Sequence, residues 1–164
     1  MLYKTTQDLI QTKNPVIFDL YAGTGTIGMI VARQAQKVYS VEIVASASED
    51  NKRNLEKNGL TNVEVINAPV ENFLKQWKQE NNTTPDVIII DPPRAGMHPD
   101  APDIIRQFSP EEIIYVSCNP ATLARDLVIL CGESEYTLTD VTPIDMFPHT
   151  HHIETVVRLQ KNKT

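Results

Sequence analysis

Alternation of strand-forming and helix-forming segments constrains this chain more than any other feature. Short apolar runs rich in β-branched residues recur at 16–18, 38–41, 63–66, 87–90 and 113–116. Segments of helical character separate them, at 27–36, 45–58, 70–78, 101–108 and 121–130. Repeated strand–helix–strand units close by right-handed crossovers into a parallel sheet covered on both faces. The run 87–90 lacks polar alternation, as expected of a strand buried on both faces. The sequence therefore predicts a doubly wound α/β fold.

The last third of the chain has a different pattern. Residues 136–141 and 153–159 are two strand candidates with only a loop, 143–152, between them. We expect them to form an antiparallel pair at one edge of the sheet. The length of 164 residues suits one domain spanning 1–164. Residues 81–85 are the best candidate for a flexible surface loop.

Composition and charge exclude several classes of protein. No uncharged apolar stretch approaches the roughly 18 residues of a membrane span, and residues 1–13 lack the pattern of a secretion signal. We therefore expect a cytoplasmic protein. The two cysteines allow at most one disulfide. The net charge is −6, whereas a domain that holds nucleic acid by itself usually carries a basic face.

A glycine-rich turn follows the first predicted strand and precedes a helix. Gly23, Gly25 and Gly28 let the backbone approach a ligand beside the amide groups of a helix start. This spacing fits both a nicotinamide dinucleotide and S-adenosylmethionine. Asp19, four residues before the first glycine, favours the cationic S-adenosylmethionine, because a carboxylate at this place attracts a cationic ligand and repels the pyrophosphate of a dinucleotide. A structural turn without a ligand is the alternative.

Two further acidic residues end predicted strands. Glu42 follows the glycine turn by some twenty residues, where a carboxylate can accept hydrogen bonds from the ribose hydroxyls of an adenosine cofactor. Its alternative role is that of an acid favoured at a helix start.

Asp91 opens the run Asp91-Pro92-Pro93-Arg94, whose prolines leave carbonyl groups free to meet a flat base. Arg94 replaces the aromatic residue that is frequent in enzymes methylating exocyclic amines, which argues for another target atom. A rigid loop without chemistry is the alternative.

Cys118 lies at a junction between strand and helix, in Ser117-Cys118-Asn119-Pro120. The amino terminus of a helix can favour the nucleophilic thiolate of such a thiol. Taken alone, a cysteine at this place is more often a small buried residue, and Cys131 is expected to be one.

The segment 143–154 holds three histidines and two acids. A zinc site normally requires a further nitrogen or sulfur ligand, and no spaced Cys/His pair is present. We therefore expect no metal, and instead a polar loop that delivers Glu154 as a base.

Together these residues resemble the RNA uracil-5 methyltransferases, which act on transfer and ribosomal RNA. The resemblance rests on residues 19–25, 91–96, 115–126 and 145–148, with Glu154 beyond them. It implies the class I methyltransferase fold, with a mostly parallel seven-stranded sheet and an antiparallel edge strand. It also implies Cys118 as the nucleophile, Glu154 as the proton acceptor and S-adenosylmethionine as the cofactor. The residues implied to line the cofactor, besides Asp19, Gly23 and Gly25, are Tyr21, Thr26, Glu42, Asp91 and, more weakly, Asn67.

This chain departs from the family pattern in two ways. Ala22 stands where the family commonly has cysteine, a position that is not the nucleophile. Family members also carry upstream RNA-binding parts, so the chain resembles the catalytic half of a longer protein. We expect an RNA substrate, ribosomal RNA ahead of transfer RNA. An RNA cytosine-5 methyltransferase and a non-catalytic S-adenosylmethionine-binding module are the alternatives.

Overall fold

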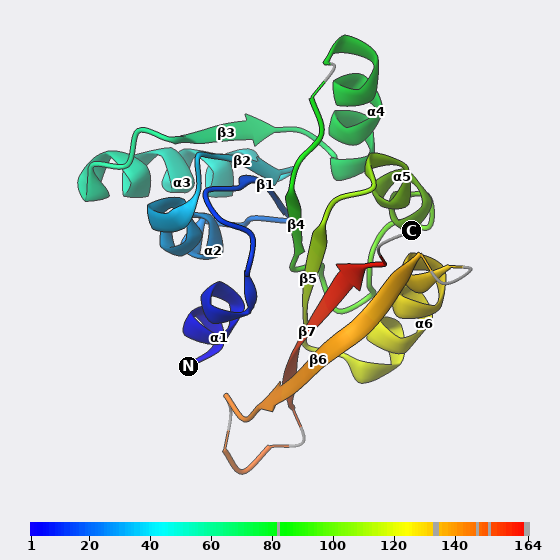
Figure 1. Ribbon diagram of the computed structural model, residues 1–164. Coiled ribbons are helices and arrows are strands. Elements are labelled where there is room, and N and C mark those ends of the chain that lie inside the picture. Colours follow the sequence, from blue (N-terminus) through cyan, green and yellow to red (C-terminus); the bar gives the residue numbers. More distant parts are fainter. Residues whose placement is uncertain (82, 133–134, 147, 151, 163–164) are drawn as a thin grey trace.

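The computed structural model describes residues 1–81, 83–132, 135–146, 148–150 and 152–162. These residues form a seven-stranded sheet with the strand order β3-β2-β1-β4-β5-β7-β6 (Figure 1). Its strands are β1 Val16–Leu20, β2 Lys37–Glu42, β3 Val63–Asn67, β4 Val87–Ile90, β5 Glu112–Ser117, β6 Tyr136–Ile144 and β7 Glu154–Lys161. The helices are α1 Leu2–Leu9, α2 Thr26–Val31, α3 Ala45–Asn58, α4 Val70–Glu80, α5 Ala101–Phe108 and α6 Pro120–Cys131, with the 3-10 turn η1 Ala32–Gln34 after α2.

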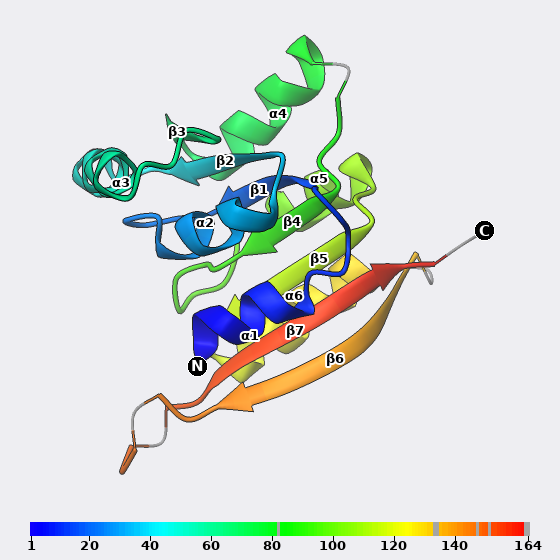
Figure 2. The ribbon, with the colours of Figure 1, turned by 60° about the vertical axis from the view of Figure 1, so that its left-hand side comes forward.

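The strands β1 to β5 pair in parallel, whereas β7 runs antiparallel to both β5 and β6. This confirms the predicted α/β fold with a mostly parallel sheet and an antiparallel pair at one edge (Figure 2). The reversed strand is β7, the second from the edge, and β6 forms the edge itself. Because β7 is reversed, its first residues lie beside the end of β5, where Thr155 is the partner of Ser117.

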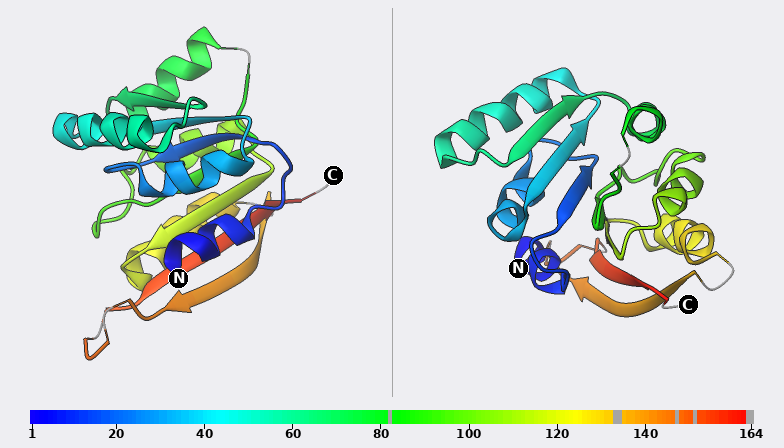
Figure 3. Two further views of the ribbon diagram at one scale, coloured as in Figure 1. Left: turned by 90° about the vertical axis from the view of Figure 1, so that its left-hand side faces the viewer. Right: turned by 45° about the horizontal axis from the view of Figure 1, so that its top comes forward.

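Helices cover both faces of the sheet (Figure 3). On one face α4, α5 and α6 pack against a core that includes Phe18, Ile88 and Tyr115. On the other face α1 and α2 pack against Ile17 and Ile89, so neighbouring residues of the central strands point into different cores. All four residues of β4 are fully buried, as the missing polar alternation predicted. No helix within these described residues is long and apolar enough to span a membrane.

Two element boundaries differ from the prediction. The helix expected over 27–36 ends as α2 at Val31 and continues only as the turn η1, because the Asn62 side chain binds the carbonyl oxygens of Ala32 and Ala35. Strand β6 continues through Pro143 to Ile144, although 143 was expected to begin a loop. Proline is tolerated in an edge strand because no outer neighbour requires its missing N–H group. The predicted loop 81–85 lies partly outside the described residues, at Asn82.

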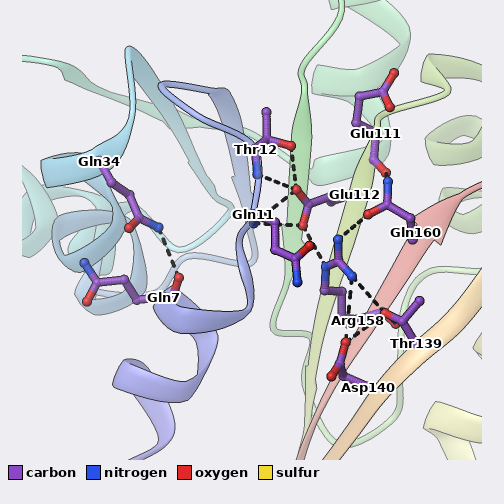
Figure 4. Close-up of polar contacts among 10 residues, drawn as sticks. All are labelled: Gln7, Gln11, Thr12, Gln34, Glu111, Glu112, Thr139, Asp140, Arg158 and Gln160. Atoms are coloured by element: carbon purple, nitrogen blue, oxygen red, sulfur yellow. Dashed lines mark hydrogen bonds and ion pairs between the residues drawn. The ribbon is translucent and has the colours of Figure 1, made fainter.

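A buried ion pair fastens the segment between α1 and β1 to the sheet (Figure 4). Arg158 Nε on β7 donates to Glu112 Oε2 at 2.8 Å, and the two side chains are only 5% and 2% exposed. The Glu112 carboxylate also accepts hydrogen bonds from the backbone amides of Gln11 and Thr12. Since Gln11 and Thr12 follow α1 directly, this contact sets where α1 lies on the sheet.

Candidate active site

The predicted functional residues gather at the carboxyl edge of the parallel strands. Glu42 ends β2, the glycine turn follows β1, Asp91 follows β4 and Cys118 follows β5. Glu154 joins them because β7 runs in the opposite direction and begins at this edge. Ligands of open α/β sheets bind outside this edge.

The glycine turn has a backbone that other residues would not adopt at low cost. Gly23 and Gly25 have positive φ angles of 56° and 83°. A Cβ atom on Gly25 would lie 2.0 Å from the Asn51 side chain, so close packing as well as backbone conformation requires glycine there. Thr26 opens α2 immediately after Gly25. The turn therefore lies tightly over α3 and leaves its outer side to a ligand.

A buried polar chain lies beneath this turn. The Ser40 hydroxyl donates to Asp19 Oδ2 and accepts from Asn51 Nδ2, both at 3.0 Å. All three side chains are fully buried, and Asp19 Oδ1 and Asn51 Oδ1 have no hydrogen-bond partner among the described residues. Burial raises the pKa of Asp19 to about 7, opposed in part by the Ser40 hydrogen bond. Asp19 thus supports the glycine turn from below and is not exposed to the site. Ser40 and Asn51 also support the turn, although no sequence motif indicated them.

Glu42 joins the end of β2 to the glycine turn. Its carboxylate accepts hydrogen bonds from the amides of Gly23 at 2.8 Å and Val44 at 2.7 Å, and the residue is 8% exposed. Asn67, at the end of β3, donates from Nδ2 to the carbonyl oxygens of Glu42 and Ile43, at 2.8 and 3.0 Å. Asn67 therefore holds the backbone that carries Glu42. Ile43 and Val44 beside it are exposed, so an acidic group and an apolar surface adjoin one another here.

Asp91, Cys118 and Glu154 line one pocket of about 320 Å³. Its other lining residues are Leu2 and Tyr3 from the first turn of α1, and Met146. Burial raises the pKa of Asp91 to about 6, and the charge of Glu154 contributes. Burial also raises the pKa of Glu154, which the neighbouring His152 opposes. The pocket thus brings a thiol and two carboxyl groups together from three different strands.

The loops that carry Asp91 and Cys118 are bound to each other through α6. Asn119 caps this helix by accepting from Ala121 N at 3.1 Å, and its Nδ2 donates to the carbonyl oxygen of Arg94 at 3.1 Å. The buried Asp126 accepts hydrogen bonds from the Tyr115 hydroxyl at 2.7 Å and from Met97 N at 3.2 Å. These contacts hold the segment after β4 against the start of α6, directly beside Cys118.

The remaining predicted residues occupy other places. Tyr21 has a positive φ of 61°, and burial raises its pKa to about 12; its buried hydroxyl has no partner among the described residues. Cys131 lies at the far end of α6, where burial raises its pKa.

Within the described ranges no group of three or more His, Cys, Asp or Glu residues could hold a metal ion. Two residues of the predicted tail, Phe147 and His151, lie outside those ranges. Leu2 and Tyr3 were not predicted as pocket residues, since nothing in the sequence pairs α1 with this edge. Met146 belongs to the loop 143–152, which was expected to lie over the site.

Comparison with known proteins agrees with this geometry. The family model for tRNA (uracil-5-)-methyltransferases matches residues 1–162. An uncharacterized RNA methyltransferase of Bacteroides thetaiotaomicron is 48% identical over 160 residues, which are 97% of this chain and 35% of that protein. One of Clostridium tetani is 45% identical over 164 residues, covering 99% of this chain and 35% of the relative. The chain thus spans about a third of the length of these relatives.

A solved structure shares the fold closely. The Pyrococcus abyssi tRNA (uracil-54, C5)-methyltransferase, in complex with S-adenosyl-L-homocysteine, superposes with a TM-score of 0.80 at 34% identity. The match covers 96% of this chain and 37% of that one. With the glycine turn and the pocket at the same sheet edge, these similarities lead to one conclusion: the chain belongs to the tRNA (uracil-5-)-methyltransferase family.

Proposed function

We propose that this chain catalyses the transfer of a methyl group from S-adenosylmethionine to carbon 5 of a uridine in RNA. The observation that carries the proposal is the shared pocket of Asp91, Cys118 and Glu154, next to the glycine turn. A thiol beside a helix start is a suitable nucleophile, and a carboxyl group within the same pocket is a suitable base. Family membership supports methyl transfer to RNA and S-adenosylmethionine as the cofactor.

The residues around the glycine turn fit this cofactor. The Glu42 carboxylate retains acceptor capacity for ribose hydroxyls, beside the exposed side chains of Ile43 and Val44. Gly23, Gly25 and Thr26 would line the cofactor along the turn, and Tyr21 and Asp91 would face it from the ends of β1 and β4. Asp19 and Asn67 would support the cofactor site without touching the cofactor, because their polar atoms are already hydrogen-bonded to Ser40 and to the Glu42 carbonyl oxygen.

The chemistry follows from the weak nucleophilicity of carbon 5 of uracil. The Cys118 thiolate adds to carbon 6, which moves electrons toward oxygen 4 and makes carbon 5 electron-rich. When bound, S-adenosylmethionine supplies the methyl group that carbon 5 takes. Glu154 then removes the proton from carbon 5, and the bond between sulfur and carbon 6 breaks. The base must leave its stack for the thiol to reach carbon 6.

The RNA itself must be held largely by parts outside this acidic chain. A net charge of −6 opposes binding of a polyanion, and the relatives are about three times as long. We propose ribosomal RNA as the first substrate to test and transfer RNA as the second, in the cytoplasm.

Two variants test this function and separate the two roles. Cys118→Ala should abolish both methyl transfer and any covalent protein–RNA complex. Glu154→Gln should still permit addition and methyl transfer, and should accumulate a complex that carries the methyl group and survives denaturation. Cys131→Ala, at the far end of α6, is the matched control and should behave as the wild type. Covalent complex formation by Cys118→Ala, or normal turnover by Glu154→Gln, contradicts the assignment of that residue.

A further inference from the structure

Two carboxyl groups flank the Cys118 thiol along the sheet edge. The strands β4, β5 and β7 are adjacent in the sheet, and Asp91, Cys118 and Glu154 lie at their neighbouring ends. All three side chains line the same pocket. Asp91 is on the side of the glycine turn, and Glu154 is on the opposite side. A base held above the thiol therefore has a carboxyl group on either side.

Addition of a thiolate to uracil needs help at oxygen 4. As sulfur bonds to carbon 6, the electrons of the double bond between carbons 5 and 6 move toward oxygen 4, where negative charge develops. A hydrogen-bond donor placed at such an oxygen stabilises the transition state. Glu154 is unsuited to this task if it is to be ionised when it later accepts the proton of carbon 5. The donor must be a second group.

We propose that Asp91 is this donor, passing a proton to oxygen 4 of uracil while Cys118 adds to carbon 6. The inference rests on the proposed function. In the first step the sulfur–carbon bond forms and the Asp91 proton moves to oxygen 4. As carbon 5 gains the methyl group, the enol proton returns to Asp91. Glu154 then takes the proton of carbon 5, the double bond reforms, and the sulfur leaves with its electron pair.

The surroundings of the two carboxyl groups favour Asp91 as the proton donor and Glu154 as the proton acceptor. Burial raises the pKa of Asp91 to about 6, and the charge of Glu154 adds to the effect. The charges of Asp19 and Asp91 also repel one another. Of the described residues that line the pocket, the other ionisable ones are Cys118 and Tyr3, and neither is a cation that would favour the ionised form of Asp91. Glu154 has His152 beside it, which works against the effect of burial. Paired carboxyl groups with different surroundings take separate acid and base roles.

The test follows the addition step with RNA that contains 5-fluorouridine. Fluorine cannot leave as a proton, so the covalent complex accumulates and its rate of formation can be measured. Transcripts of transfer and ribosomal RNA made with 5-fluorouridine are mixed with the protein and saturating S-adenosylmethionine in single turnover. Asp91→Ala should form the complex about 100-fold more slowly, the usual effect of losing one donor to a developing oxyanion. Asp91→Asn should be slowed less than Asp91→Ala, since its amide still donates a hydrogen bond to oxygen 4 although it cannot pass a proton. Asp100→Ala, an exposed carboxylate in the segment between β4 and α5, is the control.

The pH profile gives a readout that a purely structural role would not change. The Asp91 carboxyl loses its proton as the pH rises, so the wild-type rate should decline on the alkaline side of its pKa. Asp91→Asn should lack that decline, because its amide does not titrate. A decline that persists unchanged in Asp91→Asn contradicts the proposal.

A cofactor-free measurement separates this role from contact with the cofactor. With no cofactor present, addition of Cys118 lets carbon 5 take up a proton from solvent. Removal of the triton by the base, followed by loss of the sulfur with its electron pair, then releases tritium from carbon 5 of tritiated uridine in RNA. Asp91→Ala should slow this release as it slows complex formation. If Asp91→Ala releases tritium at the wild-type rate, Asp91 is not the donor, whatever its effect on cofactor binding. If the wild type, at RNA concentrations that saturate it in filter binding, forms no complex and releases no tritium with either RNA, the proposed function itself fails.

Discussion

Removal of the Glu112 carboxylate should cost this protein a large share of its stability. In Glu112→Ala the Arg158 guanidinium remains in a site where its side chain is only 5% exposed, without the carboxylate that now lies 2.8 Å from its Nε. Loss of one partner of a buried ion pair typically costs about 3–5 kcal/mol. The amides of Gln11 and Thr12 lose the same acceptor. Since a domain of this size is stable by about 5–15 kcal/mol, we expect a loss of about a fifth of that stability or more.

Urea unfolding at neutral pH measures this effect, with Glu111→Ala as the matched control. Glu111 is the preceding glutamate in the sequence and is exposed, so its replacement should change the unfolding free energy by no more than about 0.5 kcal/mol. Replacing the pair by apolar residues, as Glu112→Leu with Arg158→Met, should recover much of the loss, because no charge then stays buried alone. Equal unfolding midpoints for Glu112→Ala and Glu111→Ala would refute the reasoning.

The pH dependence provides a second check on the same pair. Burial by itself raises the pKa of Glu112, but the hydrogen bonds from Thr12, Arg158 and Gln11 outweigh it and hold the pKa below its ordinary value. A carboxyl group with a lowered pKa in the folded state contributes its stability at pH values above the pKa of the unfolded state, which is about 4.3. That contribution is lost as the pH falls through the folded pKa. The difference in unfolding free energy between the wild type and Glu112→Ala should therefore be largest at neutral pH and become smaller in acid.

Three further predictions concern the cofactor site and the RNA. Glu42→Ala should weaken S-adenosylmethionine binding by roughly 1.5–3 kcal/mol, the cost of a lost charge-assisted hydrogen bond, and unchanged affinity in calorimetry would remove Glu42 from the site. Asp19 has its pKa raised to about 7, so the folded state holds a proton that the unfolded state releases above pH about 4. Wild-type stability should therefore fall between about pH 4 and 7, while Asp19→Asn should lack this fall in urea unfolding; parallel profiles would contradict it. The chain alone should bind RNA weakly in filter binding, with a shallow salt dependence, and tight binding that weakens steeply with salt would show that the RNA surface lies here after all.

Local patterns in the sequence were sufficient to predict the sheet and the edge where the site lies. Runs of β-branched residues and the helical segments between them predicted β1 to β5, since a buried parallel strand is recognisable from its own residues. The candidate site residues Asp91 and Cys118 each follow such a strand directly. Because parallel strands end at one edge, strand direction alone brings these two residues to the same side of the molecule.

Element ends and supporting contacts could not be predicted in this way. The early end of α2 depends on the Asn62 side chain, which lies about thirty residues further along the chain. The polar chain beneath the glycine turn depends on Asn51, a residue of α3 that no motif distinguishes. Each contact joins side chains that are distant in sequence, so it exists only once the elements have packed.

The sequence by itself determined the α/β class, and it was sufficient to predict the sheet edge at which the candidate site residues gather, because periodicity and strand direction are local properties of the chain. Only the tertiary structure decided that the first turn of α1 forms one wall of the pocket, held there by the Glu112–Arg158 pair. The acidity of Asp91 likewise depends on burial and on Glu154, more than sixty residues away. Burial and electrostatic coupling arise from the surroundings of a side chain, and those surroundings are assembled from distant parts of the chain when it folds.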